Sequence, residues 1–186
     1  METWIFLLLG FVIMLISILS IFLLLTYTIP AHLVSCGRCG NSATWELYDN
    51  GTLKIHGHGP MYDFDQYVGA PWLNQKVKVK RAVLSNEISK IGNYAFSIPR
   101  NYNPDLKEAN IPSACIVIGH HAFDGCIRLK ELGLPTDLKL IGDKAIRGCV
   151  NLKIYHGITP EEDFQKIFYN SDDYDIFSGP IIAYRR

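Results

Sequence analysis

The sequence predicts a mainly-β protein: a short solenoid of about three turns, with a β-hairpin before it, a helix after it and one transmembrane helix at its N-terminus. The segment that begins at Ile118 is repeated 23 residues later from Ile141, in the pattern Ile-Gly-x-x-Ala-x-x-Gly-Cys-x-x-Leu-Lys. A fixed period of this length is typical of a solenoid, whose repeats bury their apolar faces against one another. An Asn-Gly pair flanked by alternating residues and a long uncharged N-terminal stretch predict the other elements.

Residues 1–35 read as a membrane anchor and its linker. The stretch from Trp4 to Ile29 has no charged residue, and at ~1.5 Å per residue it exceeds the ~30 Å thickness of the hydrocarbon core. Trp4 and Tyr27 lie near its two ends, where membrane proteins place an aromatic belt. We expect an uncleaved single-pass helix with the solenoid on the extracytoplasmic side. Arg38, the one basic residue nearby, is too little for charge to set this orientation.

A second interpretation of the N-terminus is a lipoprotein signal. Leu33-Val34-Ser35-Cys36 resembles the lipobox of bacterial lipoproteins, in which the cysteine is lipidated and becomes the new N-terminus. Two features count against it, because no basic residue precedes the apolar stretch and Pro30-Ala31-His32 is polar. Ordinary signal-peptidase cleavage is a third possibility, although no clean cleavage site follows the apolar stretch.

Residues 36–78 are expected to form a hairpin cap. Trp45–Tyr48 and Thr52–Ile55 alternate in polarity on either side of Asp49-Asn50-Gly51, which is the strongest short-range signal of a β-hairpin. A solenoid needs its first open face covered, and a hairpin placed before the repeats serves that purpose.

Residues 79–157 are expected to form the solenoid. A third copy of the repeat begins at Ile91, 27 residues before the next one, and the extra residues fall in the loop-forming stretch Ser97–Pro104. Four strand-like segments align with one another: Val79–Leu84, Leu106–Ile111, Leu129–Leu134 and Leu152–Gly157.

Residues 158–186 are expected to cover the other end of the solenoid. Thr159-Pro160-Glu161-Glu162 has the residues of a helix start. Phe164, Ile167 and Phe168 then follow at the spacing of one apolar helix face.

The cap and the repeats together resemble a known family. Several segments carry the resemblance: Cys39-Gly40-Asn41, Thr44–Leu47, Gly51–Ile55, Gly57–Asp63, Pro71-Trp72 and the Ile-Gly-x-x-Ala-Phe-x-Gly-Cys-x-x-Leu units. From Cys39 to Tyr155 the chain is similar to BspA-type leucine-rich-repeat proteins. This resemblance implies a surface or secreted protein that binds host, matrix or partner proteins, with no catalysis and no cofactor. The array is short for that family, and the anchor is N-terminal.

A column of lysines is the strongest candidate for a binding surface. Lys80, Lys107, Lys130 and Lys153 each follow the first apolar residue of an aligned strand, and Arg81, Glu108, Glu131 and Ile154 come next. Stacked along one edge, the lysines with Arg81 would form a stripe for an acidic partner surface or an anionic polymer. A solubilising face that discourages edge pairing is the alternative. Because the formal net charge is zero, we do not expect nucleic acid to be the partner.

The five cysteines leave at least one thiol unpaired in a monomer. Cys36 and Cys39 have the spacing of a redox or zinc motif but lie in the wrong context, so we expect a local disulfide or two free thiols. Cys126 and Cys149 occupy one column of adjacent turns, where a disulfide is possible and buried thiols are expected.

The histidines give weaker signals. His56 and His58 alternate on a strand near Asp63 and Asp65, where either a metal cluster or a solvated strand face is conceivable. The solvated face is the interpretation that we prefer, and His120-His121 receives no role.

The functional expectation is a membrane-anchored, non-catalytic protein for recognition or adhesion at a membrane surface. An accessory subunit of a larger membrane complex, held through the anchor, is the alternative.

Overall fold

The computed structural model describes residues 10–18, 30–97, 105–156 and 181–183. The chain divides after Ala31 into two units. In the first unit, residues 10–18 form a helix. Across the described part of the chain, no helix has the length and apolar character needed to cross a membrane. Most of the predicted anchor, Trp4–Ile29, lies outside the described residues, so the anchor stays a prediction.

The second unit begins with three antiparallel strands: β1 (Leu33–Arg38), β2 (Gly40–Tyr48) and β3 (Thr52–Met61). Strands β2 and β3 form the predicted hairpin, which turns at Gly51, where the φ angle of +84° favours glycine. Strand β1 was not predicted from the sequence. It begins within the segment that we assigned to the linker.

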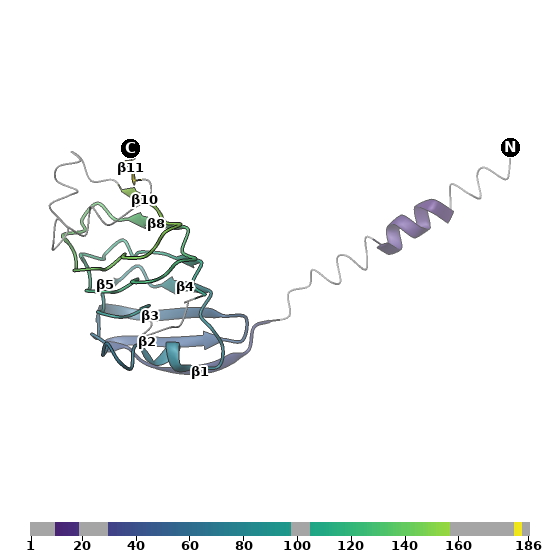
Figure 1. Ribbon diagram of the computed structural model, residues 1–186. Helices are drawn as coiled ribbons and strands as arrows, with labels where there is room; N and C mark the ends of the chain where they lie inside the picture. The colour runs from purple at the N-terminus through teal and green to yellow at the C-terminus, as the bar shows by residue number, and fades with distance from the viewer. Residues whose placement is uncertain (1–9, 19–29, 98–104, 157–180, 184–186) are drawn as a thin grey trace. The chain divides into compact units, whose positions relative to one another are not determined.

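The hairpin leads directly into two rows of parallel strands. Strand β3 pairs in parallel with both β4 (Arg81–Leu84) and β5 (Ile88–Ile91). One row continues through β6 (Glu108–Ala109), β8 (Glu131–Leu134) and β10 (Lys153–His156), and the other through β7 (Val117–Ile118) and β9 (Leu140–Ile141). Figure 1 shows the labelled strands stacked from β2 through β4 and β8 to β10. Each turn therefore adds one strand to each row, as expected of a solenoid.

The core forms because each repeat position stacks on its equivalent in the next turn. The isoleucines of the Ile-Gly pairs and the leucines before the lysines are all 0–1% exposed: Ile91, Ile118, Ile141, Leu106, Leu129 and Leu152. The rings of Phe96 and Phe123 stack with centroids 5.0 Å apart. Burial of each such side chain contributes about 1.5–3 kcal/mol.

Trp72 joins the hairpin to this core. It lies on the short 3-10 helix η1 (Pro71–Asn74) and is fully buried. Its ring contacts those of Trp45, Phe64 and Phe96, and its Nε1–H donates to the carbonyl of Ala95 at 2.9 Å. The buried indole N–H is thereby satisfied, which avoids the cost of an unpaired donor.

The last turn departs from the predicted alignment by one residue. The repeat places Ile154 beside Glu131 on the exposed face, and this is wrong. In the structure β10 pairs with β8 so that Lys153 lies beside Glu131 and Ile154 beside Leu132. The physical reason is burial, since Ile154 is fully buried and must share a face with Leu132.

A C-terminal strand continues the row. Strand β11 (Ile181–Ala183) pairs in parallel with β10. It lies within residues 158–186, which we expected to cover this end of the solenoid. The predicted helix over Thr159–Phe168 lies outside the described residues.

We expect Phe123→Ala to destabilise the full-length chain by about 3–5 kcal/mol, because it removes a fully buried ring that stacks on the turn before it. Urea unfolding followed by circular dichroism measures the loss. The exposed control Val150→Ala should change stability by less than ~0.5 kcal/mol. Equal losses in both variants would contradict this packing.

Candidate functional site

The four lysines of the predicted stripe are exposed at the start of the strands β4, β6, β8 and β10, on a surface that we call the lysine face. Three of them immediately precede their strands, and Lys153 is the first residue of β10. Their backbones are joined from turn to turn. The amide of Lys107 donates to the carbonyl of Lys80 at 2.8 Å, that of Lys130 to Lys107 at 3.3 Å, and that of Lys153 to Lys130 at 2.8 Å. Neighbouring strands are ~4.8 Å apart, so the four lysines follow one another from turn to turn, although Lys153 is offset by one position and pairs with Glu131.

The lysines of this column are exposed and unneutralised. Within the described residues, no ion pair or side-chain hydrogen bond involves the ammonium groups of Lys80, Lys107, Lys130 or Lys153. The neighbouring arginines differ. Arg81 lies 3.4 Å from Glu108, and Arg128 pairs with Asp105. The column therefore carries unpaired positive charge while its flanks are partly neutralised.

Two hollows open on the lysine face. One of about 510 Å³ has a floor of Ala82, Val83 and Ala109. A second of about 630 Å³ is lined by Arg128, Asn151 and Lys153. Three residues line both hollows: Lys107, Lys130 and Glu131. The hollows therefore adjoin along the strand row, with charged side chains around a partly apolar floor.

The five residues of the predicted stripe differ in their positions relative to the hollows. Lys107, Lys130 and Lys153 line the hollows, whereas Lys80 lines neither. The stem of Lys80 lies against the hairpin turn, because a Cβ placed on Gly51 would come within 2.9 Å of its Cγ. Arg81 lines the first hollow but is paired with Glu108. The place of Arg128 in the lining of the second hollow was not predicted, because this residue falls outside the aligned strand segments.

The five cysteines are free thiols in the structure, and only Cys36 is exposed. Burial raises the pKa of the Cys39 and Cys149 thiols to about 12. Cys126 and Cys149 each donate to the carbonyl of a phenylalanine one turn earlier, Phe96 and Phe123 respectively. The structure agrees with the buried-thiol interpretation of that column. A disulfide between Cys36 and Cys39 and lipidation of Cys36 stay predictions.

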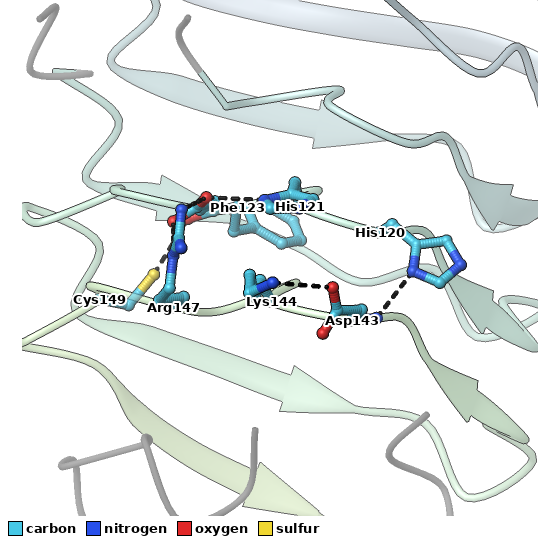
Figure 2. A network of polar contacts seen from close by, with 8 residues as sticks. His120, His121, Phe123, Asp143, Lys144, Arg147 and Cys149 are labelled. Atoms are coloured by element: carbon cyan, nitrogen blue, oxygen red, sulfur yellow. Dashed lines mark hydrogen bonds and ion pairs between the residues drawn. The ribbon is translucent and has the colours of Figure 1, made fainter. Parts of the chain in front are cut away.

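A ladder of side-chain acceptors, which we call the acceptor ladder, joins the turns after the second strand row. Asp63 Oδ1 accepts from the amide of Asn93 at 2.9 Å, and Asn93 Oδ1 from the amide of His120 at 2.8 Å. His120 Nδ1 then accepts from the amide of Asp143 at 2.9 Å, as Figure 2 shows. This role of His120 was not predicted from the sequence, because three different side chains serve as acceptors at one repeat position.

Asp63 begins the acceptor ladder as a carboxylate. Burial would raise its pKa, but the hydrogen bond from the Asn93 amide and the ammonium of Lys90, 2.8 Å away, together lower the pKa below its ordinary value. A charged acceptor makes a stronger hydrogen bond than a neutral one. Asp63 therefore joins the hairpin cap to the first turn of the solenoid as a charged acceptor.

The next position of each turn holds a residue in the left-handed conformation. Tyr94, His121 and Lys144 have φ angles of 54°, 53° and 53°. His121 stacks on Tyr94 with ring centroids 4.8 Å apart, and its Nδ1 lies 2.8 Å from Asp124. Arg147 also donates to the carboxylate of Asp124, which its Nε approaches to 3.0 Å. His121 thus belongs to a contact network that strengthens the stack of turns.

A polar cluster covers the exposed side of the hairpin. Glu46 accepts from the hydroxyl of Tyr48 at 2.7 Å and lies 3.2 Å from His56 Nε2. The hydrogen bond from Tyr48 is the main cause that lowers the pKa of Glu46. Among the described residues, no group of three or more histidine, cysteine or acidic side chains is placed to hold a metal ion.

Comparison with known sequences fits this architecture. The sequence profile of the BspA type leucine rich repeat region matches residues 68–153 and 97–173, which together make up more than half of the chain. The chain belongs to the BspA-type leucine-rich-repeat family. No curated protein matches it.

The structure is also similar to a crystal structure of a leucine-rich repeat protein from Eubacterium ventriosum ATCC 27560. The two share 17% sequence identity with a TM-score of 0.44, over 68% of this chain and 45% of that protein. This BspA-type chain therefore corresponds to less than half of that protein's length.

A matched pair of variants at His120 tests whether the acceptor ladder stabilises this BspA-type chain. We expect His120→Leu to destabilise the chain by about 1–2 kcal/mol, because the amide of Asp143 loses its acceptor. His120→Asn keeps an acceptor of the kind that Asn93 supplies in the previous turn, so this variant should lose less than ~0.5 kcal/mol of stability. Urea unfolding of both variants measures the difference. Equal stability of the two would contradict the ladder.

The thiols give a second test. At pH 8 we expect iodoacetamide to label Cys36 rapidly in the folded chain, because it is the only exposed cysteine. The four buried thiols should react only in denaturant, since burial removes access and keeps Cys39 and Cys149 protonated. Intact mass counts the labels, and Cys36→Ser should abolish the rapid one. A wild-type chain without a rapid label would instead indicate a disulfide or lipid at Cys36.

Proposed function

We propose that this BspA-type chain is a non-catalytic recognition module that binds a protein partner through the lysine face. The observation that carries the proposal is the pair of adjoining hollows on that face, lined by Lys107 and Lys130 without ion-pair partners among the described residues. An exposed sheet face with unpaired charge around an apolar floor suits a partner that supplies opposite charge and small apolar groups.

Recognition takes place, in this proposal, at a membrane surface on the extracytoplasmic side. The support is the uncharged stretch Trp4–Ile29, whose length suits a single-pass anchor. The lipoprotein alternative requires cleavage before Cys36. That cleavage would remove Leu33–Ser35 from β1, including residues in register with Tyr48 and Leu47 of β2. Retention of the anchor preserves this strand. We further propose that the hairpin and the C-terminal residues close the two ends of the solenoid.

Gly133 offers a way to block the lysine face without disturbing the core. It lies on β8 two residues after Glu131, and a Cβ placed on it would meet no atom within 4 Å. Gly133→Trp should therefore cover the face while the fold is kept. Val150→Trp is the matched control, since Val150 is exposed and lies outside the strands of this row.

The test is mild-detergent extraction of the full-length chain from its native membrane, with mass analysis of the chain and of whatever co-purifies. We expect an uncleaved chain with fixed companions that Gly133→Trp loses and Val150→Trp keeps. Companions that survive Gly133→Trp would favour an accessory subunit held through the anchor and overturn the proposal. A chain that begins at lipidated Cys36 would overturn the anchor.

A further inference from the structure

We propose that the lysine face binds an extended acidic polypeptide segment, with Lys107, Lys130 and Lys153 as its carboxylate contacts. This inference rests on the proposed function and specifies the chemistry of the partner. The three lysines are the members of the column that line the hollows, and no described side chain neutralises them. Since the whole chain has a formal net charge of zero, the unpaired lysines mark a local feature and not a general basic excess.

The geometry suits an extended chain that crosses the strand row. Adjacent strands lie ~4.8 Å apart, so the Cα atoms of three successive lysines span roughly 10 Å. An extended peptide rises ~3.3 Å per residue and directs alternate side chains to one side, about 7 Å apart. Flexible lysine stems bridge this difference. Acidic residues at alternate positions of a bound segment can therefore each reach an ammonium group.

The carboxylates on the same face favour a polypeptide over a uniform polyanion. Glu131 lines both hollows beside Lys107 and Lys130, and within the described residues it has no ion-pair partner. A sulfated polysaccharide or a nucleic acid would place negative charge against Glu131, which is repulsive. A polypeptide can place a basic or neutral residue there.

The apolar floor of the first hollow also favours a polypeptide as the partner. Ala82, Val83 and Ala109 line the first hollow between the charged side chains, and Val83 is 38% exposed. Small apolar side chains of a peptide can pack on this floor, while a uniformly charged polymer has no group for it. The mixture of unpaired lysines, one unpaired glutamate and an apolar floor therefore matches a segment in which acidic residues alternate with small apolar ones.

Binding can be measured on the full-length chain in detergent by fluorescence anisotropy. The probes are a labelled twelve-residue peptide of alternating Glu and Ala, its counterpart of alternating Lys and Ala, and labelled heparin. We expect the Glu-Ala peptide to bind and the Lys-Ala peptide not to bind, with weaker affinity at higher salt. Lys107→Gln together with Lys130→Gln should weaken peptide binding about fivefold or more, because two ion pairs are lost.

Matched variants distinguish the effect of the lysines at the hollows on binding from the effect of a lower net charge. Lys76→Gln together with Lys139→Gln removes the same charge from exposed lysines that line neither hollow, and should change affinity less than twofold. Glu131→Gln should raise the affinity for heparin severalfold, because it removes the repulsive carboxylate. It also serves as a second variant if the double lysine variant does not fold.

Three results would overturn the inference. They are equal losses in the two double variants, heparin binding tighter than the peptide in the wild-type chain, and no effect of Glu131→Gln on heparin. The co-purification of native companions, described above, tests the proposed function independently of these peptide measurements. Suppose that the Gly133→Trp chain loses its co-purifying companions while the double lysine variant keeps them. Recognition through the lysine face would then be supported, and binding of an acidic segment would be contradicted. If Gly133→Trp keeps them, the proposed function itself fails.

Discussion

The stacking of one turn on the next is the constraint on which the structure depends. Each turn buries its isoleucine, leucine and phenylalanine positions only because the following turn lies directly against it. The acceptor ladder enforces this closeness. It needs a glycine at the preceding position, since a Cβ on Gly92 would come within 1.8 Å of the Tyr62 carbonyl oxygen and one on Gly142 within 2.5 Å of the His120 amide nitrogen. The glycine of each Ile-Gly pair therefore serves close approach of backbones.

The same constraint builds the lysine face. Once the turns are stacked, the residue after each strand-leading apolar residue (Val79, Leu106, Leu129 and Leu152) lies exposed on one side of the sheet. Four ammonium groups at that position would repel one another in a compact protein, and nothing in the core requires them. Their exposure and the adjoining hollows make the face suitable for recognition, while the opposite side of the same strands is committed to packing.

The period of the repeat and the polarity of its residues were sufficient to predict the solenoid, the hairpin and the exposure of the four lysines. Features that depend on contacts between turns were not predictable. The role of His120 is hidden because aspartate, asparagine and histidine all supply an acceptor at that position. The left-handed conformation at Tyr94 has no glycine to signal it. The register of Ile154 follows from burial, and sequence spacing alone favours the wrong alignment.

Photo-crosslinking in the native membrane tests the central claim, recognition through the lysine face, most directly. A benzophenone side chain placed at Val83, on the floor of the first hollow, samples the face itself, and one at the exposed Val150 samples a position outside both hollows. We expect a discrete crosslinked species from Val83 and none from Val150. Crosslinks from Val150 alone would contradict the account, because the partner would then bind away from the lysine face.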